Sequence, residues 1–204
     1  MIEQQYLQRV RKIAQHEIGH YIASRHFGFT TGDVTVQVSG LTGGHRGGST
    51  IELHTPLRTI TEIDDYLCRR IIILYAGALS EPIFTGAPVK KIGEAELHEA
   101  VRIIKDPQSG AHNDHAKIRE LRYLLRNIRF PDTPASDEGP VHAELDALDK
   151  ELWQRAIDVV DKYYMTISGL AGNLTDRLTE HGAEIRVTSA ELEKIPAVAE
   201  IVPV

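Results

Sequence analysis

The chain has 204 residues, 42% of them hydrophobic, which is enough to bury a substantial core within one domain. Its 23 basic residues against 29 acidic ones give a formal net charge of −6, which argues against nucleic acids and anionic membranes as partners. The lone cysteine cannot form an internal disulfide, and no apolar run approaches the roughly 18 residues that cross a bilayer, so a cytoplasmic location is expected.

The first quarter of the sequence predicts one helix followed by two strands. Apolar residues recur at helical spacing over residues 3–27, and Gly28 is placed to end this helix. β-branched and polar residues then alternate over 34–38, and a similar pattern returns at 49–53, so both segments are predicted to be strands. The connection between them is rich in glycine and too long for a tight hairpin.

A second long helix is predicted over residues 60–84. Thr59 and Glu62 have the spacing of a capping box, in which each side chain accepts a hydrogen bond from the backbone amide of the other residue. The centre of this helix has the sequence IIILYAGAL and is apolar on nearly all sides, which predicts that it is buried in the core.

The middle of the chain contains a predicted insertion and a predicted linker. Residues 86–109 are interpreted as an inserted surface segment that holds a short helix over 94–104. An amphipathic helix follows from about Asn113. Residues 131–140 have the composition of a linker.

The C-terminal part is predicted to be helical. The helical pattern runs from 141 to about 180 and is interrupted near Gly169 and Gly172, which indicates a helix-turn-helix or a kinked long helix. Ser189 is placed to cap a short last helix over 190–195.

The most informative segment is residues 16–20, His-Glu-Ile-Gly-His, within the first predicted helix. On a helix, positions i and i+4 lie on one face about 6 Å apart along the axis, so both imidazoles can bind a single metal ion. Glu17 projects about 100° away, where its carboxylate can accept a proton from water. This pattern is typical of zinc peptidases, in which zinc lowers the pKa of water toward about 7. A chance match on a helix without metal is the alternative.

A catalytic zinc needs a third protein ligand, for which the sequence offers several candidates. His26 has the spacing found in metzincins, but Ala23 stands where that family needs a glycine. The helix is therefore predicted to continue and to carry His26 about 15 Å beyond His16, where we interpret it as a helix-end residue stabilised by the helix dipole. Glu81 and Asp114 are the other candidates, although an aspartate at a helix start more commonly satisfies free backbone amides.

Four segments, taken in order, resemble the motifs of one known family. AQHEIGHYIAS is similar to HEAGHA, LYAGALSEPIFTG to GGRAAEEVFFG, and SGAHNDHAKIRELRYLL to TGASNDLEQATELARRMV. The tail, from LWQRAIDVV to VTSAELEKI, is similar to the helical end of the same domain. The chain thus resembles the peptidase domain of the FtsH-type AAA proteases over almost its whole length. Ala78 and Pro82 stand where that family has an arginine and a second glutamate.

The resemblance implies a site with one zinc ion per chain. His16, His20 and Asp114 correspond to the zinc ligands and Glu17 to the general base. Glu81 falls near the site, where it either supports the ligands or competes as one.

The resemblance also implies the fold. We expect a mainly α domain with a small β-sheet or hairpin, in which a zincin-like core surrounds the HExxH helix. Residues 1–130 would form the metal-binding part and 141–204 a C-terminal helical layer, within a single domain spanning 1–204.

Members of this family bind polypeptide substrates in extended form along an edge strand. That role falls here to Gly48, Ser49, Thr50 and Ile51, through backbone hydrogen bonds of the β-augmentation type. The resemblance further implies a homo-oligomeric ring, most readily a hexamer.

Two parts of that family have no counterpart in this sequence, the ATPase module and the membrane anchor. The chain contains no Gly-Lys dipeptide and hence no phosphate-binding loop of the G-x-x-x-x-G-K-[ST] type. We therefore expect a peptidase that cuts flexible polypeptides by itself or is served by a separate ATPase. The rival hypothesis is a catalytically idle relative that binds peptides and retains the metal for stability.

Overall fold

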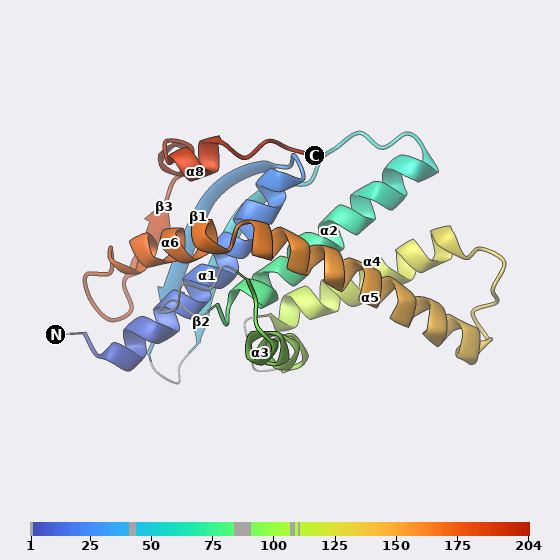
Figure 1. Cartoon of the computed structure of the whole chain (residues 1–204), viewed down its shortest axis with the longest axis horizontal. Coiled ribbons are helices and arrows are strands. Elements are labelled where there is room, and N and C mark those ends of the chain that lie inside the picture. Colours follow the sequence, from blue (N-terminus) through green and yellow to red (C-terminus); the bar gives the residue numbers. More distant parts are fainter. Residues whose placement is uncertain (1, 41–43, 84–90, 107–108, 110) are drawn as a thin grey trace.

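The computed structural model describes residues 2–40, 44–83, 91–106, 109 and 111–204. Two long helices, α1 (Gln4–His26) and α2 (Ile60–Ser80), pack against each other at the centre of the molecule (Figure 1). The other helices are α3 (Glu94–Lys105), α4 (His112–Arg129), α5 (Glu138–Lys162), α6 (Tyr164–Thr175), α7 (Ser189–Leu192) and α8 (Pro196–Ala199). None of the helices in the described part of the chain combines the length and the hydropathy that a bilayer crossing needs.

A three-stranded antiparallel sheet packs beside α1, in the order β2-β1-β3. The central strand β1 (Thr30–Val38) pairs with β2 (His45–Glu52) on one side and with β3 (Glu184–Val187) on the other. Its alternate valines at 34, 36 and 38 are buried, as expected for a strand with one face on the core. The mainly helical architecture with a small sheet confirms the predicted fold class in its general form.

The sheet differs from the prediction in three places, the first of which is that β1 begins at Thr30 rather than at 34. β2 begins at His45 rather than at 49, because Gly47 and Gly48 pair with β1 and belong to the strand instead of the connection. β3 was not predicted, since it has four residues with a charged residue at every second position and forms only where β1 offers a partner. The connecting residues 41–43 lie outside the described residues.

The start of α2 confirms the predicted capping box. The Thr59 amide donates to Glu62 Oε2 at 2.9 Å, and the Glu62 amide donates to Thr59 Oγ1 at 3.2 Å. The predicted burial of its apolar centre is also confirmed, with the side chains of 71–74 all buried. The helix ends at Ser80 rather than at 84, because Pro82 has no amide hydrogen to continue the helical bonds.

The predicted insertion at 86–109 lies partly outside the described residues, but its helix is present as α3 with almost the predicted bounds. Ala100, Ile103 and Ile104 are buried where α3 packs against α2 and α4. This helix therefore lies at the surface with one apolar face packed on the core, while Val101, Arg102 and Lys105 on its other side are exposed. The linker predicted over 131–140 is shorter, since α5 already begins at Glu138.

The C-terminal helices also depart from the prediction. The chain breaks between α5 and α6 at Tyr163, whereas Gly169 and Gly172 both lie inside α6. Glycine lowers helix propensity by only about 1 kcal/mol, which the packing of α6 against α1 outweighs. Thr188, rather than Ser189, caps α7 by accepting a hydrogen bond from the amide of Glu191.

The close packing of α1 on α2 depends on residues without side chains. A Cβ atom built on Gly19 would lie 2.7 Å from the carbonyl oxygen of Ala76 and would also clash with Ser80. On the opposite helix, a Cβ atom on Gly77 would lie 2.5 Å from His20 Nε2. The two glycines therefore set the distance between the helices.

We expect Gly19→Ala to destabilise the protein by about 1–3 kcal/mol, because the methyl group forces the two helices apart. The matched control is Gly169→Ala, whose Cβ atom meets nothing within 4 Å. This control is expected to gain about 0.4–1 kcal/mol from the reduced entropy of the unfolded chain. Urea unfolding midpoints measure both changes, and equal shifts for the two variants would contradict the prediction.

Candidate metal centre

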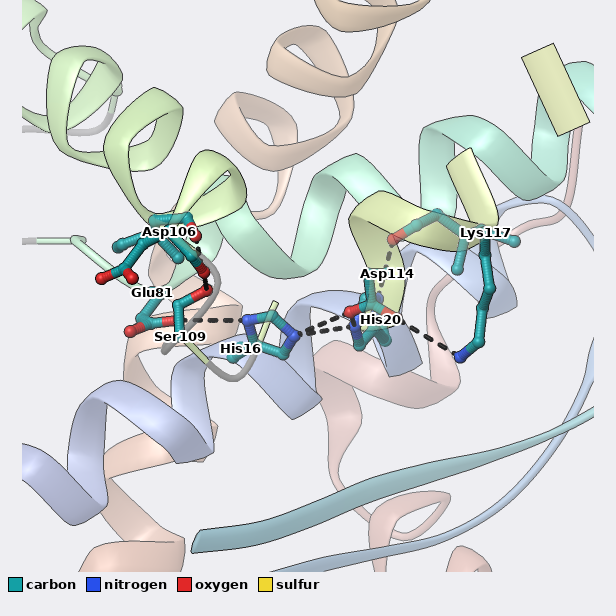
Figure 2. A network of polar contacts seen from close by, with 9 residues as sticks. His16, His20, Glu81, Asp106, Ser109, Asp114 and Lys117 are labelled. Atoms are coloured by element: carbon teal, nitrogen blue, oxygen red, sulfur yellow. Dashed lines mark hydrogen bonds and ion pairs between the residues drawn. The ribbon is translucent and has the colours of Figure 1, made fainter. Parts of the chain in front are cut away.

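Two histidines of α1 and one aspartate of α4 converge at a buried point (Figure 2). His16 and His20 lie one helical turn apart, and Asp114 approaches them from the first turn of α4. Asp114 Oδ2 lies 3.1 Å from His16 Nε2 and 2.9 Å from His20 Nε2, and the two Nε2 atoms are 3.0 Å apart. All three residues are buried, and together they could hold a metal ion.

The second nitrogen of each imidazole is held by an oxygen of α2 or its end. His20 Nδ1 lies 2.8 Å from the carbonyl oxygen of Ile73, and this contact requires Nδ1 to carry a proton and donate it. His16 Nδ1 lies 3.2 Å from Glu81 Oε2, on the side of the ring away from Asp114 (Figure 2). Such outer hydrogen bonds fix the tautomer of metal-binding histidines and leave Nε2 to face the metal.

The three converging atoms fit a divalent cation. When each Nδ1 atom carries a proton directed at an oxygen, both Nε2 atoms are unprotonated and their lone pairs face the carboxylate oxygen of Asp114. These three electron-rich atoms repel one another unless a positive group lies between them. Ligand atoms of a tetrahedral zinc site are roughly 3.3 Å apart, since each lies about 2.0–2.1 Å from the ion. The separations of 2.9, 3.0 and 3.1 Å are close to that spacing.

Without a metal ion, protons supply the positive charge. Burial alone lowers the pKa of His16, but hydrogen bonds with Asp114 and Glu81 and the charge of Glu17 outweigh it and raise the pKa to about 10. Burial raises the pKa of Asp114, but the charge of His20 and the hydrogen bonds with both histidines hold it well below its usual range. The two histidines and Asp114 are therefore more stable with a positive charge among them than without one. A bound metal ion would supply this charge in place of the proton on His16.

Asp114 does not have the role that is common for aspartates at a helix start. It is the third residue of α4, after Ala111 as N-cap, and this helix has no side-chain cap hydrogen bond. Its Oδ2 faces the histidines, and its Oδ1 lies 3.5 Å from Lys117 Nζ. Of the two roles expected for Glu81, the geometry matches support of His16, because it contacts the nitrogen that faces away from Asp114.

Glu17 lies next to this group, between α1 and β2. Its side chain is buried and packs directly on Gly47, where a Cβ atom would lie 2.8 Å from Glu17 Cδ. Gly47 therefore leaves the space that the carboxylate of Glu17 occupies.

A cavity of about 270 Å³ opens in front of the three converging residues and Glu17. Its other walls come from Gly47, Gly48, Ser49 and Ile51 of β2 and from Arg70 and Leu74 of α2. Because β2 is an edge strand of the described sheet, only one of its sides is paired. The cavity thus runs along a strand with unpaired backbone groups.

Three of the four residues that were predicted to bind substrate line this cavity, and Thr50 does not. Its side chain packs over Gly32 of β1, where a Cβ atom would lie 2.9 Å from Thr50 Cβ. Successive side chains of a strand point to opposite faces, which explains why Thr50 is directed away.

Several cavity residues, among them Lys117 and Arg70, were not predicted from the sequence. Lys117 follows Asp114 by three positions, so helical spacing from this predicted ligand could have indicated it. No sequence signal distinguishes Gly47 from the other glycines of its segment.

His26 does not join the metal-binding group. It is the last residue of α1, as predicted, and its Nδ1 lies 3.3 Å from the hydroxyl of Tyr163. Burial and the nearby charge of Lys162 lower its pKa. His26 thus lies at the helix end, as predicted, and its burial favours the neutral ring.

A scan against models of known protein families finds no match, and a search of curated proteins finds none either. The chemistry of the site therefore has to be inferred from its own residues and their geometry.

We expect the protein to bind one divalent ion per chain and to be stabilised by it. At a free metal concentration 100-fold above Kd, the gain is about 2.7 kcal/mol, because the ion binds only the folded state. Metal analysis after gel filtration and thermal unfolding with and without a chelator measure the two effects. His16→Ala should lose both, whereas the control His142→Ala, at an exposed position on α5, should keep them.

Proposed function

We propose that the protein is a zinc metallopeptidase that hydrolyses peptide bonds of unfolded or flexible polypeptides. The observation that carries this proposal is the buried group of His16, His20 and Asp114 beside Glu17, at the wall of a cavity that follows an edge strand. The order of its sequence motifs, which resemble those of FtsH-type peptidase domains, agrees with this chemistry.

The residues that would hold zinc are His16, His20 and Asp114. This set of two neutral imidazoles and one carboxylate leaves a fourth position open, as catalytic zinc sites require. Zinc in such a site polarises a carbonyl group and makes water a stronger nucleophile near neutral pH. Ile73 and Glu81 keep the two imidazoles oriented through their Nδ1 atoms.

Glu17 is the residue that moves the proton. Its carboxylate accepts a proton from the attacking water and delivers it to the nitrogen of the leaving amine. Burial beside Gly47 keeps the side chain in one place, next to the histidines but outside the metal-binding group. A well-placed general base of this kind contributes about 10²–10⁴-fold to the rate.

The substrate would bind as an extra strand along β2. Gly48, Ser49 and Ile51 line the cavity, and backbone hydrogen bonds to an edge strand recognise any extended peptide whatever its sequence. Folded proteins rarely offer a free extended segment, which is why flexible polypeptides are the proposed substrate class.

Glu17→Gln is expected to lower casein hydrolysis by at least 100-fold while zinc remains bound, because the amide cannot accept the proton. A fluorescent casein assay measures the rate, and metal analysis of the same sample measures the zinc. The control is Glu120→Gln on the exposed face of α4, which removes the same charge without touching the cavity.

Hydrolysis that persists in Glu17→Gln would exclude Glu17 as the general base. If the zinc-loaded wild-type protein cuts no member of a broad peptide library but still binds peptides, the rival function applies. The protein would then be a catalytically idle peptide-binding relative that keeps the metal for stability.

A further inference from the structure

Arg70, a charged side chain in the cavity wall, forms no hydrogen bond or ion pair with the part of the chain that the structure describes. Arg70 is only 8% exposed, yet its Nη1 atom is buried without a hydrogen bond, and its guanidinium forms no ion pair within 4 Å with any described residue. Burial lowers the pKa of Arg70, although the nearby groups Tyr66 and Asp114 act in the opposite direction. Burying an unpaired charge is costly, so a position of this kind indicates a ligand that supplies the missing acceptor.

The position of Arg70 relates it to both the metal centre and the predicted substrate strand. It precedes Ile73, whose carbonyl oxygen holds His20, by about one helical turn. One turn in the other direction, the hydroxyl of Tyr66 donates to the carbonyl oxygen of Leu53 at 3.1 Å. Leu53 follows β2 and also lines the cavity. Arg70 thus lies on α2 between a residue that holds His20 and a residue that contacts the segment after β2.

The other charged groups of the cavity already have roles. Asp114 faces the two histidines, and Lys117 lies 3.5 Å from its second oxygen. Glu17 packs against Gly47. Among the described residues that line the cavity, Arg70 is therefore the one cation without an acidic group in contact, and a divalent ion at the metal centre would make its surroundings still more positive.

We propose that Arg70 binds a carboxylate group of the peptide substrate. The guanidinium can hold a carboxylate through two parallel N–H···O hydrogen bonds, which a lysine at this position could not do. The carboxylate comes either from an Asp or Glu side chain close to the scissile bond or from the C terminus of the peptide. This inference rests on the peptide-binding part of the proposed function and adds a specificity to it.

The test measures binding rather than turnover, in zinc-loaded Glu17→Gln protein. Fluorescence anisotropy compares labelled peptides that differ only in Glu against Gln at one position, and peptides that end in a carboxylate against an amide. We expect the carboxylate form of one such pair to bind roughly 10-fold to 100-fold more tightly. The pair that shows the difference identifies the source of the carboxylate.

Adding Arg70→Gln to this protein should abolish the preference. The matched control is Arg58→Gln, which removes the same charge at an exposed position outside the cavity and should leave the preference intact. Equal binding of both peptides in every pair, or no peptide binding, overturns the inference. If the wild-type protein hydrolyses no peptide but the carboxylate preference depends on Arg70, the proposed catalysis is wrong and the carboxylate subsite stands. If the wild-type protein hydrolyses peptides but shows no carboxylate preference, the subsite is wrong and the proposed catalysis stands.

A stability measurement separates this role from a purely structural one. Arg70→Met removes an unpaired buried charge, so its Tm is expected to equal or exceed that of the wild-type protein. Arg70→Lys keeps the charge without the two-pronged geometry and should retain only part of the preference. A marked fall in Tm for Arg70→Met would show that Arg70 stabilises the folded protein, because such a fall is expected when a paired buried charge is lost. This result would overturn the proposal.

Discussion

The close contact between α1 and α2 is the constraint on which the candidate site depends. Gly19 and Gly77 have no side chains, and this lets the backbone of α2 reach the imidazole of His20. At this distance the carbonyl oxygen of Ile73 accepts a hydrogen bond from His20, and Glu81 at the end of α2 contacts His16. One helix thus presents the two histidines, and the packing of the second helix fixes their orientation.

The charge balance of the site follows from the same packing. The interior is costly for a single charge, so the histidines and Asp114 can be buried together only if a proton or a metal ion lies among them. This requirement raises the pKa of His16 and holds that of Asp114 low in the metal-free protein. Arg70 is buried in the wall of the same cavity with its Nη1 atom without a hydrogen bond, which distinguishes it from the groups around the metal centre.

Much of the local structure could be predicted from the sequence, because it depends on residues within one or two helical turns. The apolar spacing of α1 and the capping box of Thr59 and Glu62 are of this kind. Other features depend on distant partners and could not be predicted. β3 forms only beside β1, 150 residues earlier in the chain, and α6 continues through Gly169 because it packs on α1.

The sequence alone is sufficient to place His16, Glu17 and His20 on one helix, with the two histidines pointing the same way, since the helical repeat fixes positions i and i+4. It left Glu81 and Asp114 as alternative partners for the histidines. Only the tertiary structure decided that Asp114, 98 residues after His16, faces the two Nε2 atoms and that Glu81 faces Nδ1. The packing of α2 on α1 and of α4 on α2 sets which carboxylate meets which nitrogen, and such packing joins segments that lie far apart in the chain.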